Sequence, residues 1–437
     1  MSFPRYPKYK DSGLEWLGEV PEHWELRRIG HYFNERREKV SDKDFLALSV
    51  TKYGIVPQLE SAAKSADGEN RKKVCKGDFV INSRSDRKGS AGVSNLDGSV
   101  SLICTVMHPQ EHVHILYVHH LLRCQLFQEE FYRNGKGIVA DLWSTNYSEM
   151  RNILLGMPTL LEQTTIAYFL NSETAKIDTL IAEQRRLVEL LKEKRQAVIS
   201  HAVTKGLNPD APMKASGIEW LGDVPMHWSV CSIRRVVSSI EQGWSPECFA
   251  RPAEDQEWGV LKAGCVNRGV YEQSDNKALP TELLPLPEYE VRVGDVLMSR
   301  ASGSPELVGS TAFVTSTRDK LMLSDKIFRF YFDKRMEPQF FVAALNSRPL
   351  RSQIEQALSG GNGLANNLPQ LSLRSFFLCV PPKKEQLKIC AYLDYQTVQF
   401  NNLTAEAQHA INLLQERRTA LISAAVTGQI DVRGHSN

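Results

Sequence analysis

Apolar residues recur every seven positions along two stretches of the chain, at 166–198 and again at 389–421. A sustained seven-residue repeat is typical of a long helix that buries one stripe against another helix. Thr159 and Glu162 form a capping-box pattern before the first stretch, and Gly206 and Gly428 stand where the two helices are expected to end. A helix of about 40 residues would be roughly 60 Å long. The repeating apolar positions are Ile166, Leu170, Ile177, Leu180, Leu187, Leu191 and Val198 in the first stretch, and Ile389, Leu393, Phe400, Leu403, Ala410, Leu414 and Leu421 in the second.

Each apolar stripe needs a partner, and the other stripe is the obvious one. If a two-fold axis relates the two stretches, their helices pair in antiparallel orientation. The alternative is that each stripe packs on its own lobe, but a sustained heptad favours a coiled coil. The predicted helix–helix interface consists of Ile177, Leu180, Leu187, Leu191, Phe400, Leu403, Leu414 and Leu421.

The internal repeat also extends beyond these two stretches. Residues 12–24 (SGLEWLGEVPEHW) return 204 positions later as residues 216–228 (SGIEWLGDVPMHW). The Glu-Gln pairs that open the two helices, at 162–163 and 385–386, are 223 positions apart, so the second copy is longer by 223 − 204 = 19 positions. The ends of the copies are similar while their middles diverge. This pattern predicts two similar lobes about a pseudo-two-fold axis, with the scaffold kept and the binding surfaces varied.

The two divergent middles contain short strand-like runs bounded by turn residues. Examples are residues 77–81, 100–104, 294–298 and 327–332. We therefore expect an α/β (α+β) protein in which two similar mixed lobes are joined by two long helices pairing as an antiparallel coiled coil. The expected segments are 1–157 and 207–380 for the lobes (with a linker at 207–212), 158–206 and 381–430 for the helices, and 431–437 for a tail.

Composition narrows the class of protein further. The chain has 437 residues, of which 42% are hydrophobic and 24% charged, as in soluble globular proteins of two or three domains. No apolar run has membrane-spanning length and no signal peptide is visible, so we expect a cytoplasmic protein. Eight cysteines stand singly, without a CxxC pair, which argues against a zinc ribbon and fits a reducing compartment. The net charge of +2 excludes a polycationic tail but allows a local basic face.

Motifs for chemistry on nucleic acids are missing. The sequence contains no P-loop, and its one Asn-Pro, at residues 208–209, lies in the linker rather than in an adenine-methyltransferase motif. His108, His112 and His114 could bind a metal ion, but the second copy has no counterpart, so we prefer a solvated loop. His23 and His227 recur beside Trp and are more simply scaffold residues than catalytic bases. No catalytic, cofactor-binding or metal-binding residue is therefore predicted in this chain.

Basic and glycine-rich loops recur at matching places in the two middles. They lie at 82–90 and 134–137 in the first copy, and at 299–304 and 360–363 in the second. Glycine permits close backbone approach, and Arg, Lys, Ser and Asn contact phosphates or base edges. Any one of these loops could be an ordinary turn, but their paired recurrence favours a DNA-binding surface. The candidate DNA-binding residues are Arg84, Arg87, Lys88 and Lys136 in the first copy, and Arg300, Ser302, Ser304 and Asn362 in the second; residues 71–73 form a further basic cluster that is either a phosphate contact or a solvated edge.

These motifs together resemble the specificity subunit of Type I restriction–modification enzymes. The resemblance rests on the two GxEWLGxVPxHW leaders, on the Pro-x-x-x-Glu-Gln-x-x-Ile helix entries, and on the Arg-x-Ala-x-Ile-Ser helix tails that run to Ala-Val-Thr. It covers nearly the whole chain, although Cys390 replaces the Ala of the first helix entry and the first glycine loop reads Gly-Lys-Gly.

The resemblance implies a division of labour within a larger complex. Segments 1–157 and 207–380 would be target-recognition domains that each read half of a bipartite, asymmetric site in double-stranded DNA. The helices would be spacers that set the gap. Two methyltransferase subunits would flip and methylate adenine, and restriction subunits would cleave unmodified DNA. S-adenosylmethionine, Mg²⁺ and ATP would belong to those partners.

Other interpretations stay open at this point. The chain could be a coiled-coil assembly protein that never touches bases, but that does not explain why the middles diverge while the ends persist. It could be an enzyme in its own right, against which the missing motifs count. It could also be a similar subunit of another class of restriction system.

Overall fold

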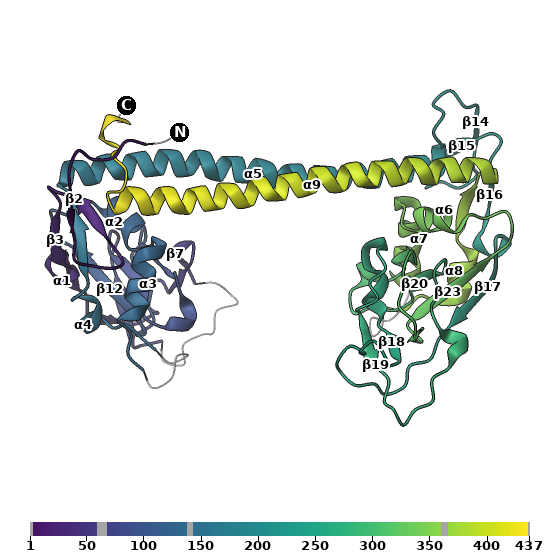
Figure 1. Ribbon diagram of the computed structural model, residues 1–437, viewed down its shortest axis with the longest axis horizontal. Helices are drawn as coiled ribbons and strands as arrows, with labels where there is room; N and C mark the ends of the chain where they lie inside the picture. The colour runs from purple at the N-terminus through teal and green to yellow at the C-terminus, as the bar shows by residue number, and fades with distance from the viewer. Residues whose placement is uncertain (1–2, 59–67, 138–142, 360–365, 436–437) are drawn as a thin grey trace. The chain divides into compact units, whose positions relative to one another are not determined.

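The computed structural model describes residues 3–58, 68–137, 143–359 and 366–435 (Figure 1). The chain divides into two compact units, and both boundaries between them fall within the long helices. The first unit comprises Met1–Arg185 and Gln408–Asn437, and the second comprises Arg186–Ala407. Each unit therefore contains one half of each long helix as well as one lobe.

The first unit is built on a four-stranded antiparallel sheet. Short apolar runs form its central strands, which are buried because helices cover one face and a second sheet lies beside them. The strand order of this sheet is β10 (Ala91–Val93), β9 (Phe79–Asn82), β12 (Cys104–Pro109), β4 (Phe33–Glu35). A separate three-stranded sheet has the order β11 (Gly98–Val100), β8 (Arg71–Val74), β5 (Lys39–Val40). Three two-stranded pairs complete the lobe: β6 (Leu48–Thr51) with β7 (Gly54–Pro57), β3 (Glu25–Arg28) with β13 (Leu154–Met157), and β1 (Tyr9–Asp11) with β2 (Glu19–Pro21). Its lobe helices are α1 (Ile29–Tyr32), α2 (Ile115–Leu121), α3 (Gln125–Arg133) and α4 (Tyr147–Met150).

The second unit repeats this plan with a longer chain. Most of its strand pairs are antiparallel, and the pair β18–β22 is parallel. Its four-stranded sheet has the order β17 (Val237–Gln242), β23 (Ile327–Phe332), β20 (Val296–Ser299), β21 (Thr311–Phe313); its three-stranded sheet has the order β19 (Asn276–Ala278), β18 (Gly259–Leu261), β22 (Leu321–Met322); β14 (Met213–Ala215) pairs with β15 (Asp223–Pro225), and β16 (Ser229–Ser232) with β24 (Phe377–Val380). Its lobe helices are α6 (Pro338–Leu345), α7 (Arg348–Ser359) and α8 (Gln370–Ser375).

The strand positions show where the second copy gains its extra length. The offset between equivalent strands is 237 − 33 = 204 for β17 and β4, 296 − 79 = 217 for β20 and β9, and 327 − 104 = 223 for β23 and β12. The chain is therefore lengthened in two places, mostly before β20 and to a smaller extent between β20 and β23. From β12 onward the two copies keep one constant offset, because α6 and α7 also start 223 positions after α2 and α3.

The predicted mixed fold is confirmed, with one correction to a strand. The run 100–104 was expected to be a single strand, but β11 ends at Val100 and β12 begins at Cys104. The intervening residues form a turn, in which the Cys104 amide donates to the Ser101 carbonyl at 3.0 Å and Leu102 is 40% exposed. Apolar composition alone does not reveal this turn.

The two long helices are α5 (Leu160–Lys205) and α9 (Lys383–Val426). In the first unit the start of α5 lies beside the end of α9, and in the second unit the end of α5 lies beside the start of α9, so the helices pair antiparallel (Figure 1). Asp178 accepts two bonds from Arg418, at 2.9 and 3.2 Å, in the first unit. Arg195 donates to Asn401 at 3.4 Å in the second. Because 178 + 223 = 401 and 195 + 223 = 418, these are equivalent contacts in the two copies, as expected for an internal repeat.

The structure corrects part of the predicted helix interface. Ile177, Leu191, Phe400 and Leu421 are buried and Leu414 is half-buried, but Leu180, Leu187 and Leu403 are 45%, 42% and 47% exposed. The buried seam alternates steps of four and three residues, which places neighbouring residues rather than these three leucines in it. The seam positions are Leu170, Thr174, Ile177, Ile181, Gln184, Val188, Leu191, Arg195 and Val198 on α5, and Leu393, Thr397, Phe400, Thr404, Ala407, Ile411, Leu414, Arg418 and Leu421 on α9.

Candidate nucleic-acid interface

Each leader is fastened to the first turn of a long helix by a glutamate. In the first unit the Glu162 carboxylate accepts from Tyr6 Oη at 2.7 Å and Trp24 Nε1 at 3.2 Å, and lies 2.8 Å from His23 Nε2. The negative charge also suits the helix N-terminus. Burial and the Glu162 carboxylate raise the pKa of Tyr6, so its hydroxyl stays protonated and donates. We call this group the first leader clamp.

The second leader clamp uses equivalent residues. The Glu385 carboxylate lies 2.8 Å from His227 Nε2 and accepts from Trp228 Nε1 at 3.0 Å. Both repeated histidines therefore hold a leader to its helix. The clamps fix the position of each lobe, and its loops, on the helices of its own unit.

Two predicted loops of the first lobe meet on a segment that the sequence analysis did not single out. Ser144 forms bridges to both Arg84 and Lys136, with Lys136 N–Ser144 O at 3.0 Å, and Ser85 N donates to Trp143 O at 3.0 Å. The exposed indole of Trp143, 41% accessible, stands beside them. An exposed aromatic next to converging basic loops could have indicated this segment, but a lone Trp is a weak signal.

Every predicted cation of the first lobe has a partner. Asp86 lies 3.4 Å from Arg84 and 3.8 Å from Arg87, and Lys136 lies 3.4 Å from Glu149. The Lys88 ammonium lies 5.5 Å from the centroid of the Tyr132 ring. The bond from the Ser148 hydroxyl, helped by Lys136, lowers the pKa of Glu149 and keeps that carboxylate charged. DNA phosphates would have to compete with these partners for the same cations.

The predicted loop of the second lobe is held by its own backbone. Arg300 N donates to Lys326 O at 2.8 Å, Leu368 N donates to Arg300 O at 2.9 Å, and Ser302 N donates to Asn366 O at 3.2 Å. The Arg300 guanidinium donates to the Asp325 carbonyl at 3.1 Å and lies over the Phe328 ring. Arg300 thus holds the loop in place and also gives it a positive charge.

The two serines of this loop have different places. Ser302 Oγ accepts from Ser304 N at 3.2 Å, which makes a local turn, and Ser304 precedes a short 3₁₀ helix without capping it. The fourth candidate of this lobe, Asn362, lies outside the described residues.

Two further sequence candidates are placed elsewhere. Arg71 is 4% exposed and donates to Ser99 Oγ at 2.9 Å, so it supports a strand and is not available to phosphates. His108 lies 3.4 Å from the buried Asp78, whereas His112 packs near His31, and burial lowers the pKa of His114. Across the four described ranges, no three His, Cys, Asp or Glu residues come together as a metal site.

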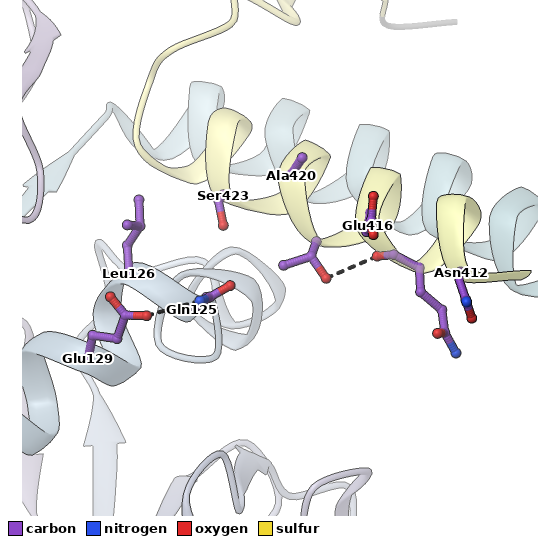
Figure 2. Close-up of a pocket in the computed structure, with 9 residues that line it drawn as sticks. Gln125, Leu126, Glu129, Asn412, Glu416, Ala420 and Ser423 are labelled. Carbon is purple, nitrogen blue, oxygen red and sulfur yellow. Dashed lines mark hydrogen bonds between the residues drawn. The ribbon is translucent and has the colours of Figure 1, made fainter. Parts of the chain in front are cut away.

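The first lobe also has a groove of 740 Å³ between α3 and the end of α9 (Figure 2). Gln125 and Glu129, which hydrogen-bond to each other at 2.9 Å, form one wall, and Glu416 stands on the other. Its two charged lining residues are both acidic, so this groove repels phosphates and does not belong to the nucleic-acid interface. Among the residues placed by the structure, no helix is long and apolar enough to cross a bilayer.

Comparisons with known proteins agree with the architecture. No family model matches the chain. It is 30% identical over 268 residues to the Type I restriction enzyme EcoEI specificity subunit of Escherichia coli, covering 61% of this chain and 45% of that protein, so the match spans about half the length of this relative. It is 22% identical over 370 residues to the EcoKI specificity subunit of Escherichia coli strain K12, covering 82% of this chain and 76% of that one.

Solved structures match nearly the whole chain at low identity. One, from a study of complex assembly and conformational transition of the type I R-M system, aligns with a TM-score of 0.70 and 16% identity over 93% of this chain and 98% of its own. The HsdS subunit from Thermoanaerobacter tengcongensis aligns with a TM-score of 0.53 and 17% identity over 94% and 98%. These findings show that the chain is similar in sequence to type I restriction enzyme specificity subunits and shares the fold of the solved HsdS subunit.

Proposed function

We propose that this chain selects the DNA sequence on which a type I restriction–modification complex acts. Each lobe reads one half of a bipartite, asymmetric site, and the paired helices set the gap between the halves. The observation that carries the proposal is the contrast within the repeat: equivalent clamps and equivalent helix contacts support loops of unlike sequence.

The chemistry of the complex is assigned to other subunits. We propose that methyltransferase subunits with S-adenosylmethionine flip and methylate adenine, and that restriction subunits with ATP and Mg²⁺ cleave unmodified DNA. This chain contributes binding and positioning and carries no catalytic residue. The divergence of the loops supports this assignment over an assembly protein, which would gain nothing from two unlike surfaces.

The test is a methylation map of host DNA by single-molecule sequencing, with and without this gene. We expect a split motif with two unlike halves that disappears on deletion and returns on complementation. Charge reversal of Arg84 should then alter or weaken recognition of one half, and reversal of Arg300 recognition of the other. A map that is identical in both strains, in cells that contain the co-purifying methyltransferase subunit, would contradict the proposal.

The role of the helices is tested by lengthening them together. Seven residues are inserted after Leu191 in α5 and after Thr404 in α9, because Asp178–Arg418 and Arg195–Asn401 place residues opposite each other when their numbers sum to 596. The insertion adds ~10 Å of helix, or about three base pairs. We expect both half-sequences to persist with a gap longer by about three base pairs. An altered half-sequence with an unchanged gap would refute the spacer role, and insertion into α5 alone is the misregistered control.

A further inference from the structure

We infer that a lysine-lined groove in the second lobe binds the phosphodiester backbone of DNA and anchors that lobe without reading bases. The inference rests on the proposed function. The groove has a volume of 680 Å³ and adjoins the predicted DNA-binding loop through Ala301, Ser302 and Gly303. Its cations are Lys262, Lys277 and Lys326, none of which the loop motifs had indicated.

These lysines come from three separate places in the fold. Lys262 follows β18, Lys277 lies within β19, and Lys326 immediately precedes β23. The backbone carbonyl of Lys326 accepts the Arg300 amide at 2.8 Å, so this lysine and the loop are held at a fixed spacing. Two different sheets thus bring these dispersed charges into one groove beside the loop.

Two of the three ammonium groups are not neutralised. Lys262 Nζ lies 3.1 Å from Asp275, but Lys277 and Lys326, both exposed, form no ion pair with any residue in the described part of the chain. The carboxylate of Asp325, which precedes Lys326 in the sequence, accepts a hydrogen bond from the Ser245 hydroxyl. A groove with unpaired cations and hydroxyl groups beside them attracts phosphate oxygens.

Lys277 and Lys326 differ from most predicted cations of the first lobe in having no carboxylate partner in the described part of the chain. There Arg84, Arg87 and Lys136 each lie within 3.8 Å of a carboxylate, which a phosphate would have to displace. Lys277 and Lys326 have no such carboxylate partner among the described residues, and the cations that they would displace from the DNA phosphates are released favourably. Lysine is a point charge without the planar fork that suits base edges, so it fits phosphates better than it discriminates bases.

The test compares the Lys277→Ala/Lys326→Ala double variant with wild type. The protein is the full chain, alone and with the methyltransferase subunit that co-purifies. Affinity is measured by fluorescence anisotropy for a duplex with the mapped site and for a duplex without it, between 50 and 200 mM KCl. The matched control is Lys334→Ala/Lys384→Ala, which removes two exposed charges of the second unit outside the groove.

We expect the double variant to weaken binding to both duplexes by the same factor. The slope of log affinity against log salt should become shallower by about 2 × 0.9 = 1.8, so that binding loses about tenfold less affinity across this salt range than wild type does. The control should keep the wild-type slope. The methylated motif in cells should keep both half-sequences.

Three results would overturn the inference. An unchanged salt slope would remove the phosphate role, and a loss confined to the mapped duplex would make the lysines base readers. Binding of ATP or pyrophosphate by wild type that the double variant loses, with DNA binding unchanged, would assign the groove to a free phosphate ligand. If wild type bound neither duplex, even with its methyltransferase subunit, the proposed function itself would fail and this inference with it.

Discussion

The two leader clamps are both centred on a glutamate of a long helix, but the two glutamates contact different numbers of side chains. Glu162 is 6% exposed and binds Tyr6, His23 and Trp24, whereas Glu385 has a side chain 27% exposed and binds His227 and Trp228. The extra partner, Tyr6, belongs to segment 3–11, and its bond has no equivalent among the described residues of the second unit.

The reason for the difference is the path of the chain beside each clamp. In the second unit, residues 206–215 run directly from the end of α5 into the leader. In the first unit, the end of α9 meets segment 3–11 through contacts alone: Tyr9 Oη donates to Gly428 O at 3.0 Å, Asp431 N donates to Pro4 O at 2.8 Å, and the Arg433 guanidinium lies 4.8 Å from the Tyr6 ring centroid. Hydrogen bonds and ring contacts thus replace a covalent connection, which would otherwise limit the freedom of the two segments.

Replacing the clamp glutamates should have the largest effect on the stability of the two units. Glu162→Ala leaves the buried donors of Tyr6 and Trp24 unpaired, so we expect the first unit to lose about 3 kcal/mol. Glu385→Ala leaves one such donor in a more exposed clamp, so the second unit should lose about 1–2 kcal/mol. Native-state hydrogen exchange, read on peptides of each unit, measures the two effects separately. Equal losses would show that the third partner is not the source of the difference.

Acidification should also act unequally on the two units. Burial, with Arg123, His120 and Arg418 nearby, lowers the pKa of His119 to about 3. The equivalent position 119 + 223 = 342 is Val342, which does not titrate. Because the unfolded chain binds a proton near pH 6.5 and the folded unit does not, the stability from His119 is present above that pH and is lost as the pH falls. At pH 5 the loss is about 2 kcal/mol.

His119→Gln should remove most of this pH dependence in the first unit and leave the second unit unchanged. The measurement is hydrogen exchange at pH 7 and pH 5, corrected for the intrinsic exchange rate. His409→Gln, at an exposed position on α9, is the matched control. A wild-type-like loss in His119→Gln would place the pH sensitivity elsewhere.

The smallest effect concerns the symmetric contact between the long helices. Asp178–Arg418 is an ion pair in the first unit and Asn401–Arg195 a neutral-to-charged contact in the second. Asn401→Asp should stabilise the second unit by at most about 0.5 kcal/mol, and Asp178→Asn should destabilise the first by a similar amount, because both sites are exposed. A double-mutant cycle with Arg195→Ala at low salt isolates the coupling energy. Destabilisation by Asn401→Asp, or stabilisation by Asp178→Asn, would contradict the equivalence of the two contacts.

Sequence reasoning reached the elements that repeat and missed those that do not. The leaders, the helices and the seven-residue spacing could be predicted because each occurs twice in the sequence. The predicted interface was wrong at Leu180 and Leu403 because Ile181 and Thr404, one residue further on, occupy the seam. Trp143 and Ser144 escaped notice because backbone pairing, rather than a motif, joins them to the loops. The groove lysines escaped because the fold gathers them from separate strands.

The discontinuity of the first unit also sets an order of events during synthesis. Residues up to Arg185 leave the ribosome early, but residues from Gln408 onward, which complete their core, follow only after the whole second unit, Arg186–Ala407, has been made. At about 5–20 residues per second, synthesis of that unit delays them by roughly 10–45 s. Throughout that time the apolar face of α5 around Ile177 and Ile181 has no partner from its own chain. The segment made first is therefore finished last, and a nascent chain of this protein is most vulnerable to aggregation and to chaperone capture in the segment up to Arg185.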